Sequence, residues 1–427
     1  MKTQALPVFI LGSNRSPFAK SQTTYAQASR QDLLVAALNG LIDRYALGGR
    51  LIGDVAFGAV INGVRDFNLA REALLSTALH PETPAYNVQR ACGTGLETAW
   101  QIGLKLHTGA INTGIAGGVD SNSAVPLELS ESLRAVFMAL NRARTIPDKV
   151  KALAQLKLSS LMPVVPSVNE PRTHLSMGEH TERMVKEWAV SREEQDSLAL
   201  ASHKNGANAY EKGFFRDLVG DFGGLSRDGT LRGDTSLSKL AQLKPAFDTT
   251  SGKGTLTAGN SSPLTDGAAT VLMANDLGAS ALGLSPLARL IDVQATAVDF
   301  VHGAGLLIAP TKAVAQLLTR NQLSFADFDY FEIHEAFAGQ VLCTLRAWES
   351  AEYCREKLGL KAPLGAIDSA KINVVGSSLA VGHPFAATGA RILGTLAKLL
   401  AVGGQKRGLI SICTAGGMGI AAIVESA

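Results

Sequence analysis

Four short stretches of the sequence contain side chains that can perform nucleophilic chemistry. In the first, residues 87–97, small and apolar residues recur at helical spacing from Leu96 onward, so a helix is expected to begin near Thr94 with Cys92 just before it. A helix N-terminus carries about half a positive charge, which favours a thiolate and predicts a lowered pKa for Cys92. Flanking glycines allow a close approach of the backbone. A free cysteine is more often a small buried apolar residue, so this stretch alone leaves both interpretations open.

Three later stretches carry the other reactive groups. His383 lies in a glycine- and proline-defined turn before a predicted helix, and a histidine near neutrality is the usual base that activates a thiol. Cys413 ends a predicted strand and precedes the turn 416–419, whose backbone N–H groups suit an oxyanion hole. His334 and Glu335 lie at a strand-to-helix junction, where a glutamate more often caps or pairs locally than catalyses.

Alternating strands and helices must position these groups. The predicted strands are 8–11, 55–60, 85–88, 111–116, 268–273, 287–293, 330–333 and 409–412, and the predicted helices include 32–38, 69–79, 311–320 and 388–400. This order implies a mixed α/β sheet with covered faces. Asp32 is expected to cap the first helix. The segments 117–120 and 416–419 are interpreted as equivalent turns of an internal duplication.

Composition narrows the function classes. A chain of 427 residues is expected to form two or three domains, and a net charge of +3 gives no argument for nucleic acid binding. Its four cysteines lack CxxC spacing, which disfavours zinc and a disulfide framework and indicates a reducing, cytoplasmic compartment. The apolar run 6–11 is too short for a signal peptide, and no run approaches the roughly 20 residues of a membrane-spanning helix.

The regular pattern breaks at Pro126. From there to about residue 250 the chain is rich in proline and basic residues and is interpreted as a mostly helical insertion. Leu133, Val136, Phe137 and Leu140 share one helix face beside several cations, a pattern compatible with a membrane surface. An ordinary surface helix packed on its own domain is the alternative and has the greater weight.

Nine stretches in this order resemble the thiolase family over essentially the whole chain. Within the family, the resemblance is to the β-subunit of bacterial fatty-acid β-oxidation complexes and of the mitochondrial trifunctional protein. The matching stretches are 15–18, 87–97, 116–121, 177–178, 240–247, 257–269, 334–337, 382–391 and 413–419.

The resemblance implies the thiolase fold, in which two duplicated βαβαβαββ halves form a five-layered αβαβα core with a mainly helical inserted loop domain. Residues 1–125 and 251–283 are expected to form the N-terminal half. Residues 126–250 are expected to form the loop domain, and residues 284–427 the C-terminal half.

The resemblance also implies roles for single residues. Cys92 matches the nucleophile, and His383 matches the base that accepts its proton and helps to hold the thioester oxygen. Cys413 matches the second cysteine, which exchanges a proton with the α-carbon of acetyl-CoA or with the CoA thiol. The backbone N–H groups of Cys92 and Ala415 match one oxyanion hole, where many thiolases have glycine in place of Ala415. His334 stands where many thiolases have an asparagine that positions a water in the other oxyanion hole.

Three further residues match substrate contacts of the family. Met177 and Ser262 match residues lining the pantetheine and acyl site, and Arg232 matches a contact near the nucleotide end of CoA. No metal and no tightly bound cofactor are expected, and coenzyme A enters as a substrate. The implied partners are acyl-CoA and CoA, a second copy in a homodimer or homotetramer, an α-subunit of a β-oxidation complex, and a peripheral membrane contact.

The implied reaction is that of a 3-ketoacyl-CoA thiolase, which cleaves 3-ketoacyl-CoA with CoA to acetyl-CoA and a shortened acyl-CoA. A biosynthetic acetyl-CoA acetyltransferase shares every catalytic residue and stays the nearest alternative. A β-ketoacyl-carrier-protein synthase typically pairs its cysteine with two histidines, whereas Cys413 favours the thiolase pairing. A non-catalytic lipid-binding or complex-forming subunit is a remote alternative. A dinucleotide-dependent oxidoreductase is disfavoured because no Gly-x-Gly-x-x-Gly follows the first strand.

Overall fold

The computed structural model describes residues 5–427 and contains a ten-stranded mixed sheet. Its strands follow the order β4-β3-β5-β6-β1-β7-β10-β9-β8, and β2 pairs with β6. The strands are β1 (Phe9–Arg15), β2 (Ala19–Lys20), β3 (Asp54–Phe57), β4 (Ala85–Asn87), β5 (Thr113–Asp120), β6 (Thr265–Ala274), β7 (Ala288–Ala297), β8 (Tyr330–Ile333), β9 (Arg407–Thr414) and β10 (Met418–Ser426). The predicted mixed α/β sheet is therefore confirmed.

The sheet consists of two halves with the same pairing pattern. In the first half, β1 pairs antiparallel with β6, β6 antiparallel with β5, and β5 parallel with β3. In the second half, β7 pairs antiparallel with β10, β10 antiparallel with β9, and β9 parallel with β8. The parallel β3–β4 pair has a counterpart in the parallel bridge between Phe331 and Ile372. This repeated topology confirms the predicted duplication.

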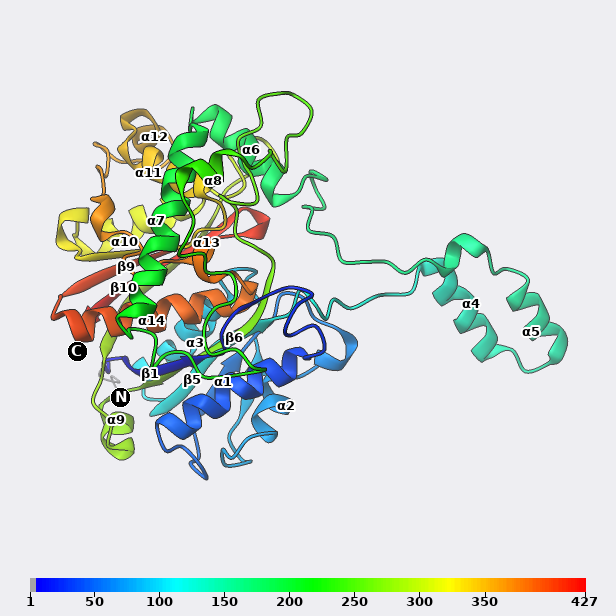
Figure 1. Ribbon diagram of the computed structural model, residues 1–427. Helices are drawn as coiled ribbons and strands as arrows, with labels where there is room; N and C mark the ends of the chain where they lie inside the picture. Colours follow the sequence, from blue (N-terminus) through cyan, green and yellow to red (C-terminus); the bar gives the residue numbers. More distant parts are fainter. Residues whose placement is uncertain (1–4) are drawn as a thin grey trace.

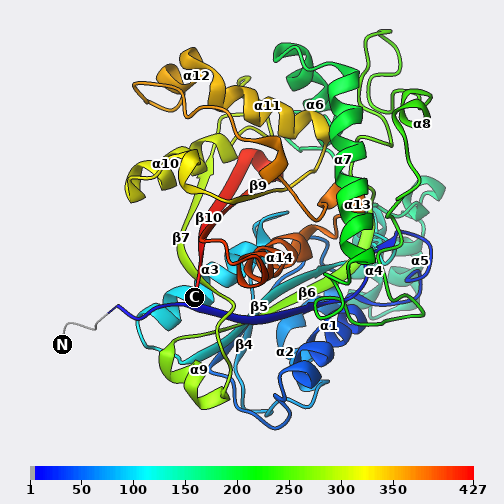
Figure 2. The same cartoon turned by 60° about the vertical axis from the view of Figure 1, so that its left-hand side comes forward.

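Helices cover both halves and fill the space between them (Figures 1 and 2). They are α1 (Arg30–Arg44), α2 (Leu69–Leu75), α3 (Thr94–His107), α4 (Glu131–Arg142), α5 (Ile146–Leu153), α6 (Met177–Glu187), α7 (Arg192–Glu211), α8 (Leu237–Ala241), α9 (Asp276–Leu282), α10 (Pro310–Asn321), α11 (Ala338–Glu349), α12 (Ala351–Glu356), α13 (Ser378–Val381) and α14 (Thr388–Gly403). The core cluster joins α3 and α14 to strands of both halves, so these two helices form the central layer.

Close packing of α3 on α14 depends on two glycines. A Cβ on Gly95 would lie 2.5 Å from the Ala390 nitrogen, and a Cβ on Gly389 would lie 2.3 Å from the Leu96 nitrogen. Both contacts are with backbone atoms that cannot move aside, so only glycine permits this approach. The start of α3, where Cys92 lies, is thereby held against the start of α14, which follows His383.

Two local predictions were wrong. Ser29, and not Asp32, caps α1, because Asp32 is the third residue of the helix and completes a capping box with the Ser29 backbone. Gly117 and Gly118 lie inside β5 and not in a turn, because they pair with Thr270 and Ala269 of β6. Glycine is needed at position 118 because a Cβ there would meet the Ala386 carbonyl oxygen at 2.2 Å. The segment 416–419, in contrast, does include the turn between β9 and β10.

One helical segment, Phe385–Gly403, is long and apolar enough to cross a membrane by length and composition. In the fold, 83% of its most apolar window is buried inside the protein. The apolar character of this segment is thus explained by its place in the central layer between the half-sheets.

The regular elements of the insertion are helices, α4 to α8 and a short 3-10 helix at Leu158–Leu161, although loops make up about half of its residues. Helices α4 and α5 pack on each other away from the rest of the fold, at the end of two extended segments (Figure 1). We call residues 127–168 the arm. Glu128 and Val164 exchange two backbone hydrogen bonds of 3.0 and 2.8 Å across the neck of the arm. Leu133 and Val136 are buried in the arm, whereas Phe137 is half exposed, so the predicted apolar face of α4 is only partly covered.

Candidate active site

Three of the reactive side chains come together from distant parts of the chain. One sulfur or ring-nitrogen atom from each of Cys92, His334 and His383 lies within 4.8 Å of the other two. Cys92 precedes α3, His334 follows β8, and His383 precedes α14. The rings of His334 and His383 are tilted by 47° relative to each other, with centroids 4.1 Å apart. The fold therefore brings three of the predicted site residues together.

The turn that presents Cys92 is held by Thr94. The Thr94 hydroxyl accepts a hydrogen bond from the Arg90 N–H at 2.8 Å and donates to the Ala91 carbonyl at 2.7 Å. Ala91 adopts φ +43°, a left-handed conformation that a non-glycine residue adopts only at a cost of about 1–3 kcal/mol. Gly93 has an ordinary φ of −86°, and a Cβ there would press on Ile420. The strain in this turn is thus carried by Ala91, while Gly93 provides space.

The prediction of a lowered Cys92 pKa was wrong. Burial raises the pKa of the Cys92 thiol well above its usual value, and the nearby carboxylates Asp120 and Glu170 raise it further. The N–H groups of Ala415 and of Cys92 itself lower it, but burial outweighs them. The resting residue is a neutral thiol, which requires a base before it can attack.

His383 is positioned to be that base. Its backbone N–H donates to the Thr265 hydroxyl at 2.7 Å, and its ring Nδ1 lies 2.6 Å from the Thr388 hydroxyl. The Thr388 hydroxyl hydrogen is directed to the Pro384 carbonyl at 3.2 Å, so Nδ1 carries a proton and donates to Thr388. The opposite nitrogen, Nε2, is then an acceptor. Burial and the Arg391 charge lower the pKa of His383 to about 3, which keeps the ring neutral.

The backbone before His383 requires glycine. Gly382 has φ +99° and ψ 172°, a region that is essentially restricted to glycine. A Cβ there would also lie 2.8 Å from the Thr265 side chain. Farther along the same loop, the Asp120 carboxylate accepts the Ala386 N–H at 2.7 Å and so ties the end of β5 to the start of α14.

Cys413 is the penultimate residue of β9 and is 1% exposed. Burial raises its pKa well above the usual value, and proximity to Cys92 raises it further. The Ala336 N–H lowers this pKa, so the loop that follows His334 also reaches the Cys413 sulfur. Like Cys92, this residue is a neutral thiol at rest, and it is therefore able to donate a proton.

The turn after Cys413 is fixed by a carboxylate from the insertion. Gly416 adopts φ +76°, and its N–H donates to Glu170 Oε1 at 2.6 Å. Glu170 is buried and lies just beyond the base of the arm. This bond orients the turn that places the Ala415 N–H close to Cys92, as the two-donor oxyanion hole requires.

His334 is fully buried beyond the end of β8. Its backbone N–H continues the pairing of β8 with β9 by donating to the Ser411 carbonyl at 2.8 Å. Asn373 clamps the preceding residue, because its side chain accepts the Ile333 N–H and donates to the Ile333 carbonyl, both at 2.9 Å. In the ring, Nδ1 lies 2.8 Å from the Ser378 hydroxyl, and Nε2 has no protein partner within residues 5–427.

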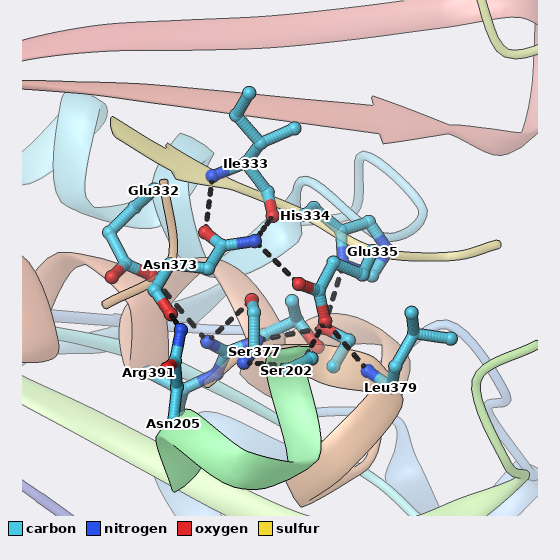
Figure 3. A network of polar contacts seen from close by, with 12 residues as sticks. Ser202, Asn205, Glu332, Ile333, His334, Glu335, Asn373, Ser377, Leu379 and Arg391 are labelled. Atoms are coloured by element: carbon cyan, nitrogen blue, oxygen red, sulfur yellow. Dashed lines mark hydrogen bonds and ion pairs between the residues drawn. The ribbon is translucent and has the colours of Figure 1, made fainter. Parts of the chain in front are cut away.

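A buried polar network supports this histidine (Figure 3). The Glu335 carboxylate accepts hydrogen bonds from Ser202 and Asn373, each at 2.7 Å, and from the Leu379 N–H at 3.1 Å. Burial raises the pKa of Glu335 nonetheless. Glu335 joins the loops around His334 and does not reach the reactive sulfurs, so the expectation that it acts locally fits its position.

The expected substrate contacts lie at different places. Met177 begins α6 and packs with the apolar cluster that contains Cys413 and Phe337. Ser262 is part-buried, and its N–H donates to the Ala336 carbonyl at 3.0 Å, beside the same loop. Arg232 is exposed and lies beside His203 of α7, to which its backbone N–H donates. The structure thus brings Met177 and Ser262 near the site, while Arg232 is on the surface.

The convergent donors also have the chemical types that zinc prefers. One cysteine and two histidines within 4.8 Å could hold a divalent ion, although their sequence spacing gave no sign of it. The same three groups suit thiol chemistry equally well. The expectation of no metal here stays a prediction.

Comparison with known proteins decides the family. A family model described as "Thiolase, N-terminal domain" matches residues 8–276, and one described as "Thiolase, C-terminal domain" matches residues 284–426. The chain belongs to the thiolase family. A thiolase is an acyltransferase, and its acyl carrier is coenzyme A.

Related thiolases match along the full chain. The 3-ketoacyl-CoA thiolase of Serratia proteamaculans is 40% identical over 424 residues, covering 98% of this chain and 96% of the relative. The 3-ketoacyl-CoA thiolase of Yersinia pestis is 38% identical over 424 residues, again covering 98% of this chain and 96% of the relative. Among solved structures, the acetyl-CoA acetyltransferase of Bacillus anthracis has a TM-score of 0.82 at 29% identity with complete coverage of both chains. Human mitochondrial 3-ketoacyl-CoA thiolase has a TM-score of 0.81 at 26% identity, with 99% of both chains covered. The thiolase fold is thereby confirmed.

Several residues that hold the thiolase site were not singled out from the sequence. They are Thr388, Ser378, Asn373, Asp120 and Glu170, each of which bonds a catalytic loop or ring. Their partners lie 5 to 266 positions away in the chain. Only Thr388, which follows His383 within the same turn, had a sequence signal that could have found it.

Proposed function

We propose that this thiolase cleaves 3-ketoacyl-CoA with CoA to acetyl-CoA and an acyl-CoA shortened by two carbons. The observation that carries the proposal is the convergence of Cys92 with His383 at a site that also holds the buried thiol Cys413. Relatives at 38–40% identity bear the name 3-ketoacyl-CoA thiolase, which favours this direction over synthesis.

In the first half-reaction, His383 Nε2 takes the Cys92 proton and the sulfur attacks the C3 carbonyl. The Cys92 and Ala415 N–H groups stabilise the oxyanion, and each such donor contributes on the order of 3 kcal/mol. The C2–C3 bond then breaks, and Cys413 protonates the departing enolate to give acetyl-CoA. An acyl group is left on Cys92 as a thioester.

In the second half-reaction, the Cys413 thiolate takes the proton of CoA-SH, whose sulfur attacks the acyl group. Cys92 leaves as a thiolate and recovers its proton from His383. Both thiols end protonated, so the cycle closes without an added acid, base or electron carrier. We propose CoA as a substrate and no tightly bound cofactor.

A chain-length series tests this function. Thiolysis rates would be measured on acetoacetyl-CoA and on 3-ketoacyl-CoA esters of ten or more carbons, together with acetoacetyl-CoA formation from acetyl-CoA. Higher kcat/KM on the longer esters supports the proposal. Activity confined to acetoacetyl-CoA would favour the acetyl-CoA acetyltransferase alternative, with which the Bacillus anthracis structure agrees. No thiolysis of any ester by folded protein would contradict both.

The perturbed pKa values predict an unusual pH profile. His383 acts in its neutral form, and its pKa is lowered to about 3, so it stays unprotonated throughout the neutral range. The raised pKa values of the two thiols keep them protonated up to alkaline pH. We expect kcat/KM for the ketoacyl ester to change less than about threefold between pH 5.5 and 8.5, because this parameter reports groups of the free enzyme. A tenfold fall centred near the ordinary histidine pKa would contradict the neutral-base assignment.

We propose that the arm rests on a bilayer that contains anionic lipids. Ile146, Val150 and Leu153 lie at i, i+4 and i+7 on α5 and are each more than half exposed. The arm has six cations, Arg134, Arg142, Arg144, Lys149, Lys151 and Lys157, and three carboxylates, Glu128, Glu131 and Asp148. Apolar exposure beside excess positive charge suits a membrane interface.

Charge removal from the arm tests this contact. Changing Arg134, Arg142, Arg144 and Lys149 to glutamine is expected to weaken sedimentation with anionic vesicles about 100-fold or more, since each surface cation contributes on the order of 1 kcal/mol. Thiolysis of a short ester is expected to be unchanged. Glutamine at the exposed Lys212, Lys253, Lys357 and Lys361 is the matched control. Unaltered vesicle binding would contradict the proposal, and loss of an α-subunit from the purified complex instead would assign the arm to that partner.

We also propose a homodimer through the β4 edge, on which a homotetramer can build. β4 ends the sheet, and an edge strand readily pairs with another chain. Val64 and Phe67 beside it are 98% and 92% exposed, and the Asn87 side chain bonds the Phe67 carbonyl at 3.3 Å. Light scattering is expected to give a multiple of the 44.7 kDa protomer and the protomer mass for Phe67→Glu. An unchanged mass for the variant would exclude this edge.

Two expectations from the sequence complete the proposal. We propose that the chain divides into an N-terminal half, the inserted loop domain 126–250 and a C-terminal half beginning at residue 284. We also propose a cytoplasmic location, which is supported by all four cysteines being free thiols in the fold.

A further inference from the structure

The position of the proton on the His334 ring matters for catalysis, given the proposed thiolase function. His334 Nε2 is buried and has no protein partner within residues 5–427, although its ring lies 4.1 Å from that of His383. A buried polar atom without a partner is uncommon, and one that points into a reactive site is usually reserved for a ligand. What Nε2 offers a ligand depends on which ring nitrogen carries the proton.

The Ser378 hydroxyl makes two contacts that settle this question. Arg391 Nη2 donates to the Ser378 oxygen at 2.8 Å, and His334 Nδ1 lies 2.8 Å from the same oxygen. A guanidinium can only donate hydrogen bonds and keeps its charge, so the Ser378 oxygen must be an acceptor toward Arg391. The single hydroxyl hydrogen is then free to point at Nδ1. If Nδ1 carried a proton as well, that hydroxyl hydrogen would lack an acceptor in a fully buried site.

The surrounding network keeps Arg391 in place (Figure 3). Its Nη1 donates to the Ser377 hydroxyl at 3.1 Å and lies 3.9 Å from the Glu332 carboxylate, which projects from the same side of β8 as His334. Glu332 has no hydrogen-bond partner within residues 5–427, and burial raises its pKa to about 8 although the Arg391 charge opposes that rise. Arg391 is 4% exposed and stands one turn into α14, the helix that begins after His383.

We propose that Arg391 and Ser378 are positioning residues that hold His334 as the tautomer with a proton on Nε2, a hydrogen-bond donor to the thioester oxygen of the substrate. The neighbouring His383 is held by Thr388 in the opposite tautomer, with a bare Nε2. The two adjacent rings thereby have different roles. His383 takes the Cys92 proton, and His334 stabilises the oxygen on which the enolate charge develops.

Serine-to-alanine variants separate this role from packing. Ser378→Ala removes the hydrogen that Nδ1 accepts, and we expect kcat to fall by about 10² to 10³, the usual effect of losing one oxyanion donor, with KM nearly unchanged. Ser29→Ala is the control, because the Ser29 hydroxyl bonds only Asp32 at the start of α1 and has no part in the network around Arg391. It is expected to stay within threefold of the wild type, and thermal unfolding of each variant reports on folding.

A double-mutant cycle with His334→Ala gives the decisive comparison. If Ser378 acts only through His334, adding Ser378→Ala to His334→Ala is expected to change kcat by less than threefold. An undiminished loss in that background, a loss in Ser29→Ala equal to that in Ser378→Ala, or an unchanged kcat in Ser378→Ala would each overturn the proposal. Thiolysis by the wild type is measured in the same assay, so failure of the proposed function is seen separately.

The tautomer can also be observed without any serine variant. The chain has eight histidines, and long-range proton–nitrogen correlation of protein labelled with ¹⁵N-histidine distinguishes a protonated ring nitrogen from a bare one. The signals of His334 are assigned by their loss in His334→Ala. A proton on Nε2 of His334 and on Nδ1 of His383 is the expected result, and a proton on Nδ1 of His334 would overturn the proposal.

Discussion

Replacement of Cys92 by alanine is expected to lower kcat for thiolysis by about 10⁴-fold or more, the scale of losing a covalent nucleophile. The reaction needs a group that attacks the C3 carbonyl and then leaves again, and among the described residues Cys92 is the thiol within reach of His383. Cys413 does not belong to this cluster of Cys92, His334 and His383. Incubation with a 3-ketoacyl-CoA in the absence of CoA is expected to add one acyl mass to the wild type, and none to Cys92→Ala.

The control for this experiment is Cys354→Ala. Cys354 is also buried, and its sulfur donates to the carbonyls of Ala347 and Trp348 at 3.6 and 3.4 Å, away from the site. Its removal is expected to leave the acyl adduct and kcat unchanged. An acyl adduct of normal amount on Cys92→Ala would show that another residue is the nucleophile and would contradict the assignment.

Replacement of Cys413 by alanine is expected to lower kcat by about 10² to 10⁴, the range for loss of a positioned acid–base group. Burial and proximity to Cys92 raise the pKa of this thiol, so it holds its proton until the enolate forms. Water is a poor replacement, because the site around Cys413 is lined by apolar side chains such as Met177, Phe247 and Phe337. Serine at this position retains a hydroxyl of weaker acidity and is expected to restore little.

Hydrogen exchange separates the two cysteines. Proton exchange at the methyl group of acetyl-CoA in D₂O requires only the group that protonates and deprotonates the α-carbon, and is followed by the mass of the recovered acetyl-CoA. Cys92→Ala is expected to retain this exchange, and Cys413→Ala is expected to lose it. If Cys413→Ala exchanges at the wild-type rate, the proton transfer belongs to another group.

The sequence predicted the elements that carry the site better than the contacts that hold it. The helix beginning at Thr94 and the strand Tyr330–Ile333 were predicted from hydrophobic periodicity, which reports which face of an element is buried. The helix that begins at Thr388 followed from the same signal. Assigning Cys92, His383, Cys413 and His334 to one reaction rested on the resemblance to a family, since they span more than 300 positions of the chain.

Electrostatic properties could not be predicted from local sequence. The start of α3 does favour a thiolate, and N–H groups do lower the pKa of Cys92, but the burial that outweighs them is produced by distant segments. The same applies to Ser378, whose influence on His334 depends on Arg391 thirteen residues later in another helix. Desolvation and hydrogen bonds shared among several side chains arise from tertiary contacts, so hydrophobic periodicity and residue spacing cannot predict them.

The backbone bridge between Glu128 and Val164 closes the arm upstream of Glu170, whose carboxylate fixes the turn beside the oxyanion donors. The helices α4 and α5 therefore lie on one side of this bridge, and the carboxylate that holds the catalytic turn lies on the other. Under the membrane contact proposed for the arm, substitutions, insertions or deletions beyond the Glu128–Val164 bridge alter docking while Glu170 still holds the catalytic turn. Attachment and turnover are in this sense separately adjustable modules, on which natural selection or protein engineering can act one at a time.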